Sequence, residues 1–301
     1  MKLFTGSSSR QLGEEVARIA GIQLSHVEHH MFPDGEQRIQ LREDVVDHDV
    51  VIVQSTGMPT DKNYIELFLL LDAATRNGAK SVTAVIPYLG YSRQDHIFRT
   101  GEARSLEVMI HGIEMNGATS VIGFDFHSIK TAELFPMHVT QLSALPIFAS
   151  EIKMHGWLDN GTVLVSPDMG GLRRLGLLSE MLGGMGQVSV EKDRDLTTGE
   201  IAESGIHGKV KRRCLIVDDM ISSGRTIVQA ATILLQHGAE EIYVFATHAV
   251  FSEDAPKTLQ ASAVRKVFVT DTIAVPESKQ FEKLEVLSIA DLLVNALSSS
   301  R

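Results

Sequence analysis

The 301-residue sequence has a single cysteine, Cys214, so no disulfide bond can form within the chain. It also has no uninterrupted apolar run of membrane-spanning length. Residues 1–25 lack the basic segment and apolar core that together make a secretory signal peptide. These absences argue against a disulfide-stapled or membrane-spanning architecture. They predict a soluble, cytoplasmic protein with no membrane partner.

Positive charge is also scarce, because 28 lysines and arginines face 38 aspartates and glutamates, for a formal net charge of −10. So acidic a chain is a poor candidate for binding nucleic acid as its main partner. Local basic loops can still bind anionic small molecules. Apolar residues make up 44% and charged residues 22%, which is typical of a globular enzyme, and the length suffices for two domains or one large one.

Strand and helix patterns alternate along the chain, which predicts an α/β fold. Residues 50–53 form a continuous aliphatic run that indicates a strand buried on both faces of a parallel sheet. A helical pattern, an Asn-Gly-Ala boundary and a strand at 81–86 follow, and a His-Gly-Ala boundary repeats this order in the second half. Gly78 and Gly238 lie 160 positions apart (238 − 78), so the sequence predicts a doubled α/β unit.

The stretch 214–226 carries the strongest chemical signal. An aliphatic run ends in Asp218 and Asp219, and a small-residue loop then opens into a helical pattern. This order builds a phosphate seat, because the first N–H groups of a helix have no partner within it. The two carboxylates can accept hydrogen bonds from ribose hydroxyls, so the stretch fits a sugar phosphate. Paired acids are also typical of a helix N-cap, and that structural alternative stays open at this point.

A second candidate lies at residues 88–104, where glycines and three arginines interrupt all periodicity. Guanidinium groups bind phosphate oxygens bidentately, so Arg93, Arg99 and Arg104 are candidates for an oligophosphate clamp. A solvated loop that binds nothing is the alternative.

Other polar residues follow strand patterns or flank polar loops. His127 ends one strand pattern and can bind a metal ion or a phosphate, although a lone histidine is more often structural. Asp168 and two glycines follow another strand pattern. Lys192 and Arg194 precede a polar stretch and could close over a reacting phosphoryl group, and a solvated charge run is the structural alternative.

Residues 26–41 contain a Pro-Asp-Gly turn at 33–35 between two extended runs, which indicates a hairpin. His26, His29 and His30 lack a recognisable metal-ligand spacing, so we expect them on the surface.

Five motifs occur in order along the chain. They are Phe-Pro-Asp-Gly-Glu at 32–36, Tyr-Ser-Arg-Gln-Asp at 91–95, Asp-Phe-His-Ser at 125–128, Ser-Pro-Asp-Met-Gly-Gly at 166–171 and Val-Asp-Asp-Met-Ile-Ser-Ser-Gly-Arg-Thr at 217–226. The last motif alone is typical of the wider phosphoribosyltransferase fold. The combination resembles the ribose-phosphate diphosphokinases, also called phosphoribosyl diphosphate synthetases, over nearly the whole chain. The short clamp at 99–103 looks more similar to archaeal-type members than to the common bacterial form.

This resemblance implies two tandem phosphoribosyltransferase-like domains, at 1–144 and 145–285, each a mainly parallel sheet flanked by helices. A C-terminal helix at 286–301 is expected to pack back on the first domain. The implied enzyme transfers the diphosphate of ATP to the C1 hydroxyl of ribose 5-phosphate and releases AMP. The resemblance further implies a homo-oligomer of two or more subunits.

The resemblance also implies residue roles. The ATP-binding residues would be Phe32, Asp34, Gly35, Glu36, Arg93, Gln94 and Asp95. Ribose hydroxyls would be bound by Asp218 and Asp219, and the 5-phosphate by Ser222, Ser223, Gly224, Arg225 and Thr226. Mg²⁺ would be held at His127 and at Asp168, and Lys192 with Arg194 would stabilise the transferring group.

The sequence departs from the family pattern at a few of these positions. His96 and Asp193 stand where members commonly carry a basic residue, which lowers the local positive charge. Ser222 and Ser223 replace the usual Asp-Thr, and their hydroxyls can still donate to a phosphate. Arg225 replaces a common glycine and would be strained if its position required a positive φ.

Two other functions compete with the synthetase. A phosphoribosyltransferase shares the loop at 218–226, but it leaves the motifs at 32–36 and 91–95 and the doubled unit unexplained. A non-catalytic companion subunit, which would bind nucleotides and regulate a true synthetase, has no need to keep Lys192 and Arg194 together with the other motifs.

Overall fold

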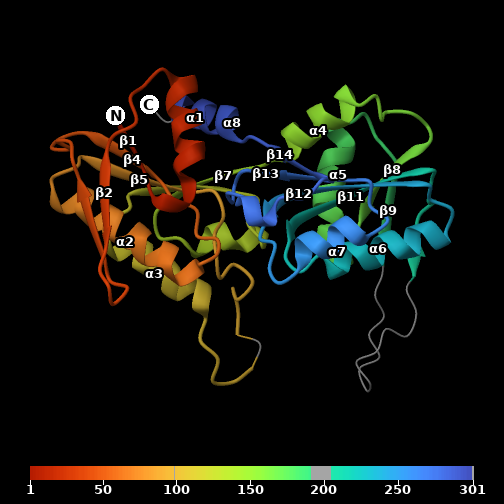
Figure 1. Cartoon of the computed structure of the whole chain (residues 1–301), viewed down its shortest axis with the longest axis horizontal. Coiled ribbons are helices and arrows are strands. Elements are labelled where there is room, and N and C mark those ends of the chain that lie inside the picture. Colours follow the sequence, from red (N-terminus) through yellow and green to blue (C-terminus); the bar gives the residue numbers. More distant parts are fainter. Residues whose placement is uncertain (98, 191–204, 300–301) are drawn as a thin grey trace. The chain divides into compact units, whose positions relative to one another are not determined.

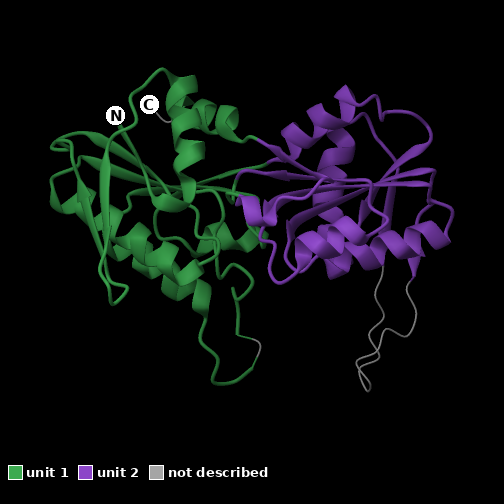
Figure 2. Cartoon of the chain, viewed as in Figure 1, with its two compact units in different colours: residues 1–143, 272–274, 288–301 green, residues 144–271, 275–287 purple. Residues whose placement is uncertain are grey.

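The computed structural model of the chain describes residues 1–97, 99–190 and 205–299, which divide into two compact units (Figure 2). Unit 1 comprises Met1–Ser143, Thr272–Ala274 and Ser288–Arg301, and unit 2 comprises Ala144–Asp271 and Val275–Leu287. Within the described ranges, no helix is both long and apolar enough to cross a membrane.

Unit 1 is built on a five-stranded sheet in the order β1-β4-β5-β6-β7, and every pair in it is parallel. The strands are β1 (Lys2–Thr5), β4 (Asp49–Val53), β5 (Ser81–Ile86), β6 (Ser120–Phe124) and β7 (His138–Leu142). The last four residues of β4 are all buried, so the aliphatic run at 50–53 is a central strand with both faces covered, as predicted.

The helices of unit 1 are α1 (Arg10–Ala20), α2 (Thr60–Arg76), α3 (Ser105–Met115) and α8 (Ala290–Ser299). Figure 1 shows α1 and α8 on one side of the sheet and α2 and α3 on the other. Leu67, Leu70 and Leu71 of α2 are fully buried in the core between this helix and the strands. Short 3₁₀ helices at Ser7–Ser9 and Ile129–Leu134 follow β1 and β6.

A separate antiparallel hairpin of β2 (Val27–Met31) and β3 (Gln37–Leu41) extends from unit 1. Gly35 takes a left-handed φ of 94°, and the Phe32 N–H donates to the Glu36 carbonyl at 2.8 Å, which closes the turn. The predicted hairpin is therefore present, with its Pro-Asp-Gly turn at the tip.

Unit 2 contains a seven-stranded sheet in the order β10-β9-β8-β11-β12-β13-β14, in which only the short β10 runs antiparallel to its neighbour. The strands are β8 (Thr162–Ser166), β9 (Gln187–Val190), β10 (Ile206–His207), β11 (Arg213–Ile221), β12 (Glu241–Ala249), β13 (Lys266–Thr270) and β14 (Leu284–Leu287). The helices are α4 (Leu145–Met154), α5 (Leu172–Met181), α6 (Arg225–Gln236) and α7 (Ala255–Ala261). Two 3₁₀ helices lie at Met169–Gly171 and Glu277–Lys279.

The two units repeat one plan. Gly78 after α2 and Gly238 after α6 have φ values of 85° and 92°, and the following alanine in each case donates its N–H back into the helix. β5 and β12 then follow, and each pairs in parallel with the strand that precedes the helix. The predicted doubled α/β architecture, with each mainly parallel sheet flanked by helices, is confirmed.

Candidate phosphate and ribose site

The candidate site in unit 2 lies at the carboxyl end of its parallel sheet. Asp218 and Asp219 lie within β11, because pairing with β12 continues past them to Ile221. The sequence placed both acids where the strand leaves the sheet, and the strand is in fact longer. Pairing with β12, which continues beyond the end of the pairing with β8 at Ile216, overrides the weak strand preference of aspartate. Ligands of open α/β sheets bind at this end of the strands.

The loop after β11 leads directly into α6. Gly224 takes the left-handed conformation at φ 76°, and α6 begins at Arg225. Arg225 therefore has a helical backbone and escapes the strain that its replacement of glycine suggested. The N-cap residue of α6 is Gly224, and no side chain caps this helix, so Asp218 and Asp219 are not its N-cap pair. The free N–H groups of the first helical turn remain available to an anion.

Arg174 on α5 faces the two acids. Its Nη1 atom lies 3.6 Å from Oδ1 of Asp218 and 3.8 Å from Oδ1 of Asp219. The sequence alone does not single out Arg174, because a helical Arg-Arg pair does not show which side chain turns toward the sheet. Burial, and then the charge of Asp219, raise the pKa of Asp218 well above its ordinary value, and Arg174 acts in the opposite direction.

Asp168 begins the turn after β8. Its Oδ1 atom accepts the Gly170 N–H at 2.9 Å and the Gly171 N–H at 3.3 Å, and its carbonyl accepts from Ser166 Oγ at 2.7 Å. A Cβ atom at Gly171 would lie 2.4 Å from Ser166 Oγ, so a larger residue here would displace the hydroxyl that donates to the Asp168 carbonyl. Both carboxylate bonds use Oδ1, and among the described residues Oδ2 has no hydrogen-bond or ion-pair partner. Oδ2 can thus ligate a cation.

In unit 1, hydrogen bonds hold parts of the clamp candidate in place, while residues 96–97 and 99–101 are exposed. Tyr91 takes a left-handed φ of 62°, and its hydroxyl donates to Asp61 Oδ1 at 2.5 Å. Arg104 Nε donates to the Asp95 carbonyl at 2.8 Å, and its Nη1 pairs with Glu107. Arg104 is therefore engaged in the fold, whereas Arg93 is exposed.

Asp95 joins this loop to the end of β6. Its carboxylate accepts hydrogen bonds from His96, with Nδ1 at 2.6 Å, and from the Ser128 side chain. Burial acts to raise the pKa of Asp95, but the two hydrogen bonds together hold it below the ordinary value. The structure thus brings the 91–95 motif beside the segment that carries His127, which is exposed.

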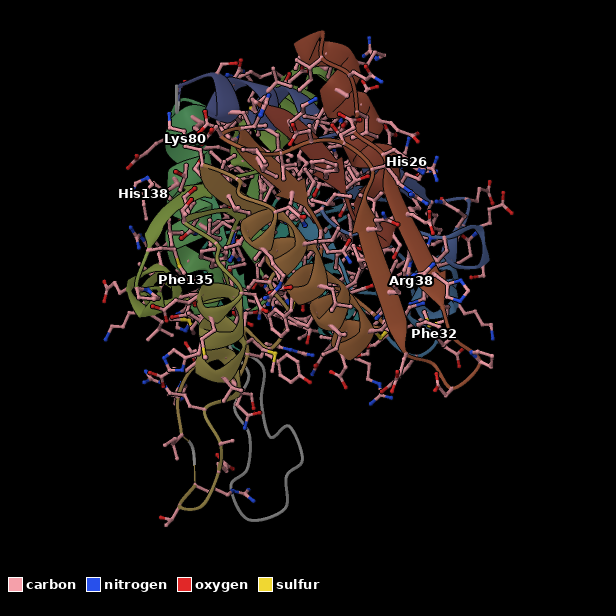
Figure 3. The ribbon with its side chains drawn as sticks, turned by 90° about the vertical axis from the view of Figure 1, so that its left-hand side faces the viewer. His26, Phe32, Arg38, Lys80, Phe135 and His138 are labelled. Carbon is pink, nitrogen blue, oxygen red and sulfur yellow. The ribbon has the colours of Figure 1, made fainter. Side chains whose placement is uncertain are left out.

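The hairpin tip presents the third predicted group of unit 1. Phe32 is 38% exposed, and Asp34, Gly35 and Glu36 are exposed as well. Figure 3 shows Phe32 at the end of the hairpin, with Arg38 further along it. The Glu36 N–H donates to Asp34 Oδ1 at 3.1 Å, and the Phe32 ring contacts His30 edge-to-face with the ring centroids 4.7 Å apart.

The predicted catalytic residues are not described by the structure, and the predicted metal ligands belong to different units. Lys192, Asp193 and Arg194 lie outside the described residues. Among residues 1–97, 99–190 and 205–299, no group of three or more His, Cys, Asp or Glu side chains could hold a metal ion. Of the two candidate ligands, His127 belongs to unit 1 and Asp168 to unit 2.

Unit 1 also contains a cavity of about 1030 Å³, away from the predicted site residues. It is lined by the first residues of several strands, among them Asp49, Ser81, Ser120 and His138, and by the end of α8. Because the candidate residues follow the opposite ends of the strands, this cavity is separate from them.

The fold and the candidate site define a doubled α/β protein with a candidate phosphate loop at residues 222–226, directly before and at the start of α6. Residues 1–117 match the N-terminal domain of ribose phosphate pyrophosphokinase, and residues 199–299 match the phosphoribosyl synthetase-associated domain. A ribose-phosphate pyrophosphokinase of Fusobacterium nucleatum is 33% identical over 99% of this chain and 94% of its own length. The ribose-phosphate pyrophosphokinase 1 of Streptococcus pneumoniae is 36% identical over 99% and 92%.

The crystal structure of phosphoribosylpyrophosphate synthetase from Mycobacterium smegmatis superposes with a TM-score of 0.93 at 31% identity, covering 99% of this chain and 98% of that one. The chain belongs to the ribose-phosphate pyrophosphokinase family, which is the predicted diphosphokinase family. The expected archaeal-type character is not borne out, since these relatives are bacterial. A five-residue surface loop tolerates substitution too readily to identify a lineage.

Proposed function

We propose that this chain transfers the diphosphate group of ATP to the C1 hydroxyl of ribose 5-phosphate, forming 5-phosphoribosyl 1-diphosphate and AMP. The observation that carries the proposal is the likeness along 99% of the chain to ribose-phosphate pyrophosphokinases. The acid pair and the phosphate loop of unit 2 supply the chemistry that a sugar phosphate needs.

Ribose 5-phosphate binds in unit 2 in this proposal. Asp218 and Asp219 accept hydrogen bonds from the ribose hydroxyls, and Arg174 holds the two carboxylates in place. The 5-phosphate binds at the first turn of α6, where the N–H groups and the positive end of the helix dipole favour an anion. The contacting residues are Ser222, Ser223, Gly224, Arg225 and Thr226.

ATP binds through unit 1 in this proposal. The exposed Phe32 ring stacks on the adenine, and Asp34, Gly35 and Glu36 of the hairpin tip supply polar groups around it. Exposed Arg93 binds phosphate oxygens, while Gln94 and Asp95 hold the loop that carries it.

The reaction needs correct placement more than covalent help from the protein. The C1 oxygen forms a bond to the β-phosphorus, the bond from that phosphorus to the oxygen shared with the α-phosphate breaks, and the hydroxyl proton is released. In-line alignment and cationic side chains around the phosphoryl oxygens supply most of the acceleration in transfers of this type. Lys192 and Arg194 are assigned that cationic role from the family pattern.

Magnesium is the proposed metal. Mg²⁺ is commonly held by one or two carboxylates together with substrate phosphates, and the Oδ2 atom of Asp168 fits that chemistry. His127 offers a nitrogen, which this cation accepts less readily than oxygen. When bound, the ion neutralises charge on the phosphoryl oxygens.

A homo-oligomer of two or more subunits in the cytoplasm completes the proposal. An exposed Phe32 ring at the end of a projecting hairpin can reach a neighbouring subunit, so the adenine residues of one subunit can serve another. Sedimentation of the purified protein would test the oligomeric state.

The activity is tested with purified protein, ATP, Mg²⁺ and ribose 5-phosphate. The proposal predicts one AMP for each molecule of a product that a separate phosphoribosyltransferase can consume. A phosphoribosyltransferase would release no AMP and would instead consume 5-phosphoribosyl 1-diphosphate with a base. A non-catalytic companion would do neither, and either result would refute the proposal.

A further inference from the structure

Residues 251–253, which follow β12, are hydrogen-bonded to the end of β11 and to the start of the candidate phosphate loop (residues 222–226). The Phe251 N–H donates to the Ile221 carbonyl at 2.9 Å, and the Ser252 N–H donates to the Ser222 carbonyl at 3.1 Å. The hydroxyl oxygens of Ser222 and Ser252 lie 2.9 Å apart, within hydrogen-bond distance. Phe251 and Ser252 are therefore held against the loop that precedes α6.

This segment takes a backbone conformation that side-chain-bearing residues rarely adopt. Phe251 and Glu253 have φ values of 43° and 52°, in the left-handed region. The Phe251 carbonyl is held by Lys279 Nζ at 2.7 Å. The result is a sharp double bend that turns the Glu253 side chain toward the start of α6.

Glu253 there meets the cation of the phosphate loop. Its Oε2 atom accepts from Nη2 of Arg225 at 2.8 Å, and both side chains are largely exposed, at 62% and 78%. An ion pair this exposed adds little to folding stability, so little is lost when it opens. Arg225 is the first residue of α6, where the 5-phosphate is proposed to bind.

We infer that Glu253 competes with the 5-phosphate for Arg225 and so sets the affinity of the ribose 5-phosphate site. This inference rests on the proposed function. Phosphate binding must draw Arg225 away from the Glu253 carboxylate, and the site therefore binds its substrate more weakly than the same loop would with a neutral residue at 253.

The neighbouring acid provides a matched control. Asp254 carries the same charge one position further on, but its Oδ1 atom accepts from Lys257 Nζ at 2.9 Å and it is 76% exposed. A change that merely reduces the local negative charge will act alike at both positions. A change that frees Arg225 will act only at Glu253.

The test measures the KM for ribose 5-phosphate in wild type, Glu253→Gln, Asp254→Asn, Arg225→Gln and the Arg225→Gln/Glu253→Gln double variant. Glu253→Gln is expected to lower KM by about two- to fivefold, the range that an exposed ion pair contributes. Asp254→Asn is expected to leave KM near the wild-type value. Arg225→Gln is expected to raise it, and adding Glu253→Gln to that variant is expected to change nothing further.

Two results would overturn the inference. One is an equal KM change in Glu253→Gln and Asp254→Asn, and the other is the same gain from Glu253→Gln whether or not Arg225 is present. Calorimetric titration of the wild type and the same variants with inorganic phosphate measures the affinity of the site without catalysis. If the wild type releases no AMP, the proposed function fails. The phosphate titration still tests the role of Glu253, because the inference predicts tighter phosphate binding in Glu253→Gln and not in Asp254→Asn.

Discussion

One guanidinium serves two carboxylates in unit 2, because Nη1 of Arg174 lies 3.6 Å from Oδ1 of Asp218 and 3.8 Å from Oδ1 of Asp219. Two acids next to each other at the carboxyl end of a strand repel when both are ionised. Arg174 offsets that repulsion and keeps their oxygens directed to the same place.

Arg174→Met should therefore raise the KM for ribose 5-phosphate by about tenfold or more, because removing one partner of a largely buried ion pair leaves the other charges uncompensated. Its effect should shrink at higher pH, since Asp218 without its cation ionises only there. Arg173→Met is the control, because Arg173 is exposed on the same helix. Equal effects of the two substitutions would show that Arg174 acts only through general charge.

The raised pKa of Asp218 makes a prediction about stability. The folded protein binds this proton more tightly than the unfolded chain does, so the stabilisation is complete below the ordinary pKa of 3.8 and is lost as pH rises through the folded-state value. Asp218→Asn should thus raise the melting temperature at pH 7 to 8 and lose that advantage near pH 3.5. Thermal unfolding of wild type and variant across this range checks it, and a gain that does not depend on pH would contradict the assignment.

The left-handed backbone at Gly224 can be tested by comparing alanine substitutions at Gly224 and at Gly183. Alanine at a left-handed position costs about 1–2 kcal/mol, and at Gly224 the new Cβ would also lie 3.3 Å from Leu259 Cγ. Gly183 has a similar φ of 80° with open space around it. Both Gly224→Ala and Gly183→Ala should lower stability in chemical denaturation, but only Gly224→Ala should also raise the KM for ribose 5-phosphate. A parallel KM increase in Gly183→Ala would mean that the loop geometry is not responsible.

Asp61 fixes the ATP-side loop through Tyr91. The hydrogen bond to Asp61 is the main cause of the raised pKa of the Tyr91 hydroxyl. Asp61→Asn should lower that pKa in an ultraviolet titration and raise the KM for ATP by about threefold to tenfold, because one hydrogen bond that fixes the loop is weakened. Asp72→Asn, which breaks an exposed pair with Arg76 on the same helix, should do neither.

The sequence predicted the architecture where the local signals were strong. A run of aliphatic residues buried on both faces, at 50–53, and matching helix ends at Gly78 and Gly238 sufficed to predict parallel strands and a doubled unit. These signals are local, since burial and helix termination each depend on a few adjacent side chains.

The site was predictable in its residue types and less so in its geometry. Asp218 and Asp219 read as the end of a strand because aspartate disfavours strands, yet pairing with β12 carries β11 on to Ile221. Arg174 contacts Asp218 and Asp219, and Glu253 contacts Arg225. These residues are far apart in the sequence, so a local sequence pattern cannot predict the contacts. The sequence also did not show which residue of the loop has a positive φ. The structure places the left-handed conformation at Gly224, because α6 begins at Arg225.

The central claim is that the β-phosphorus of ATP is attacked. Phosphorus-31 NMR of the reaction mixture measures this directly, because AMP, ADP and 5-phosphoribosyl 1-diphosphate give distinct signals. We expect AMP and 5-phosphoribosyl 1-diphosphate to appear in equal amounts as ATP and ribose 5-phosphate disappear. Formation of ADP together with a ribose bisphosphate would show transfer of the γ-phosphate and would contradict it.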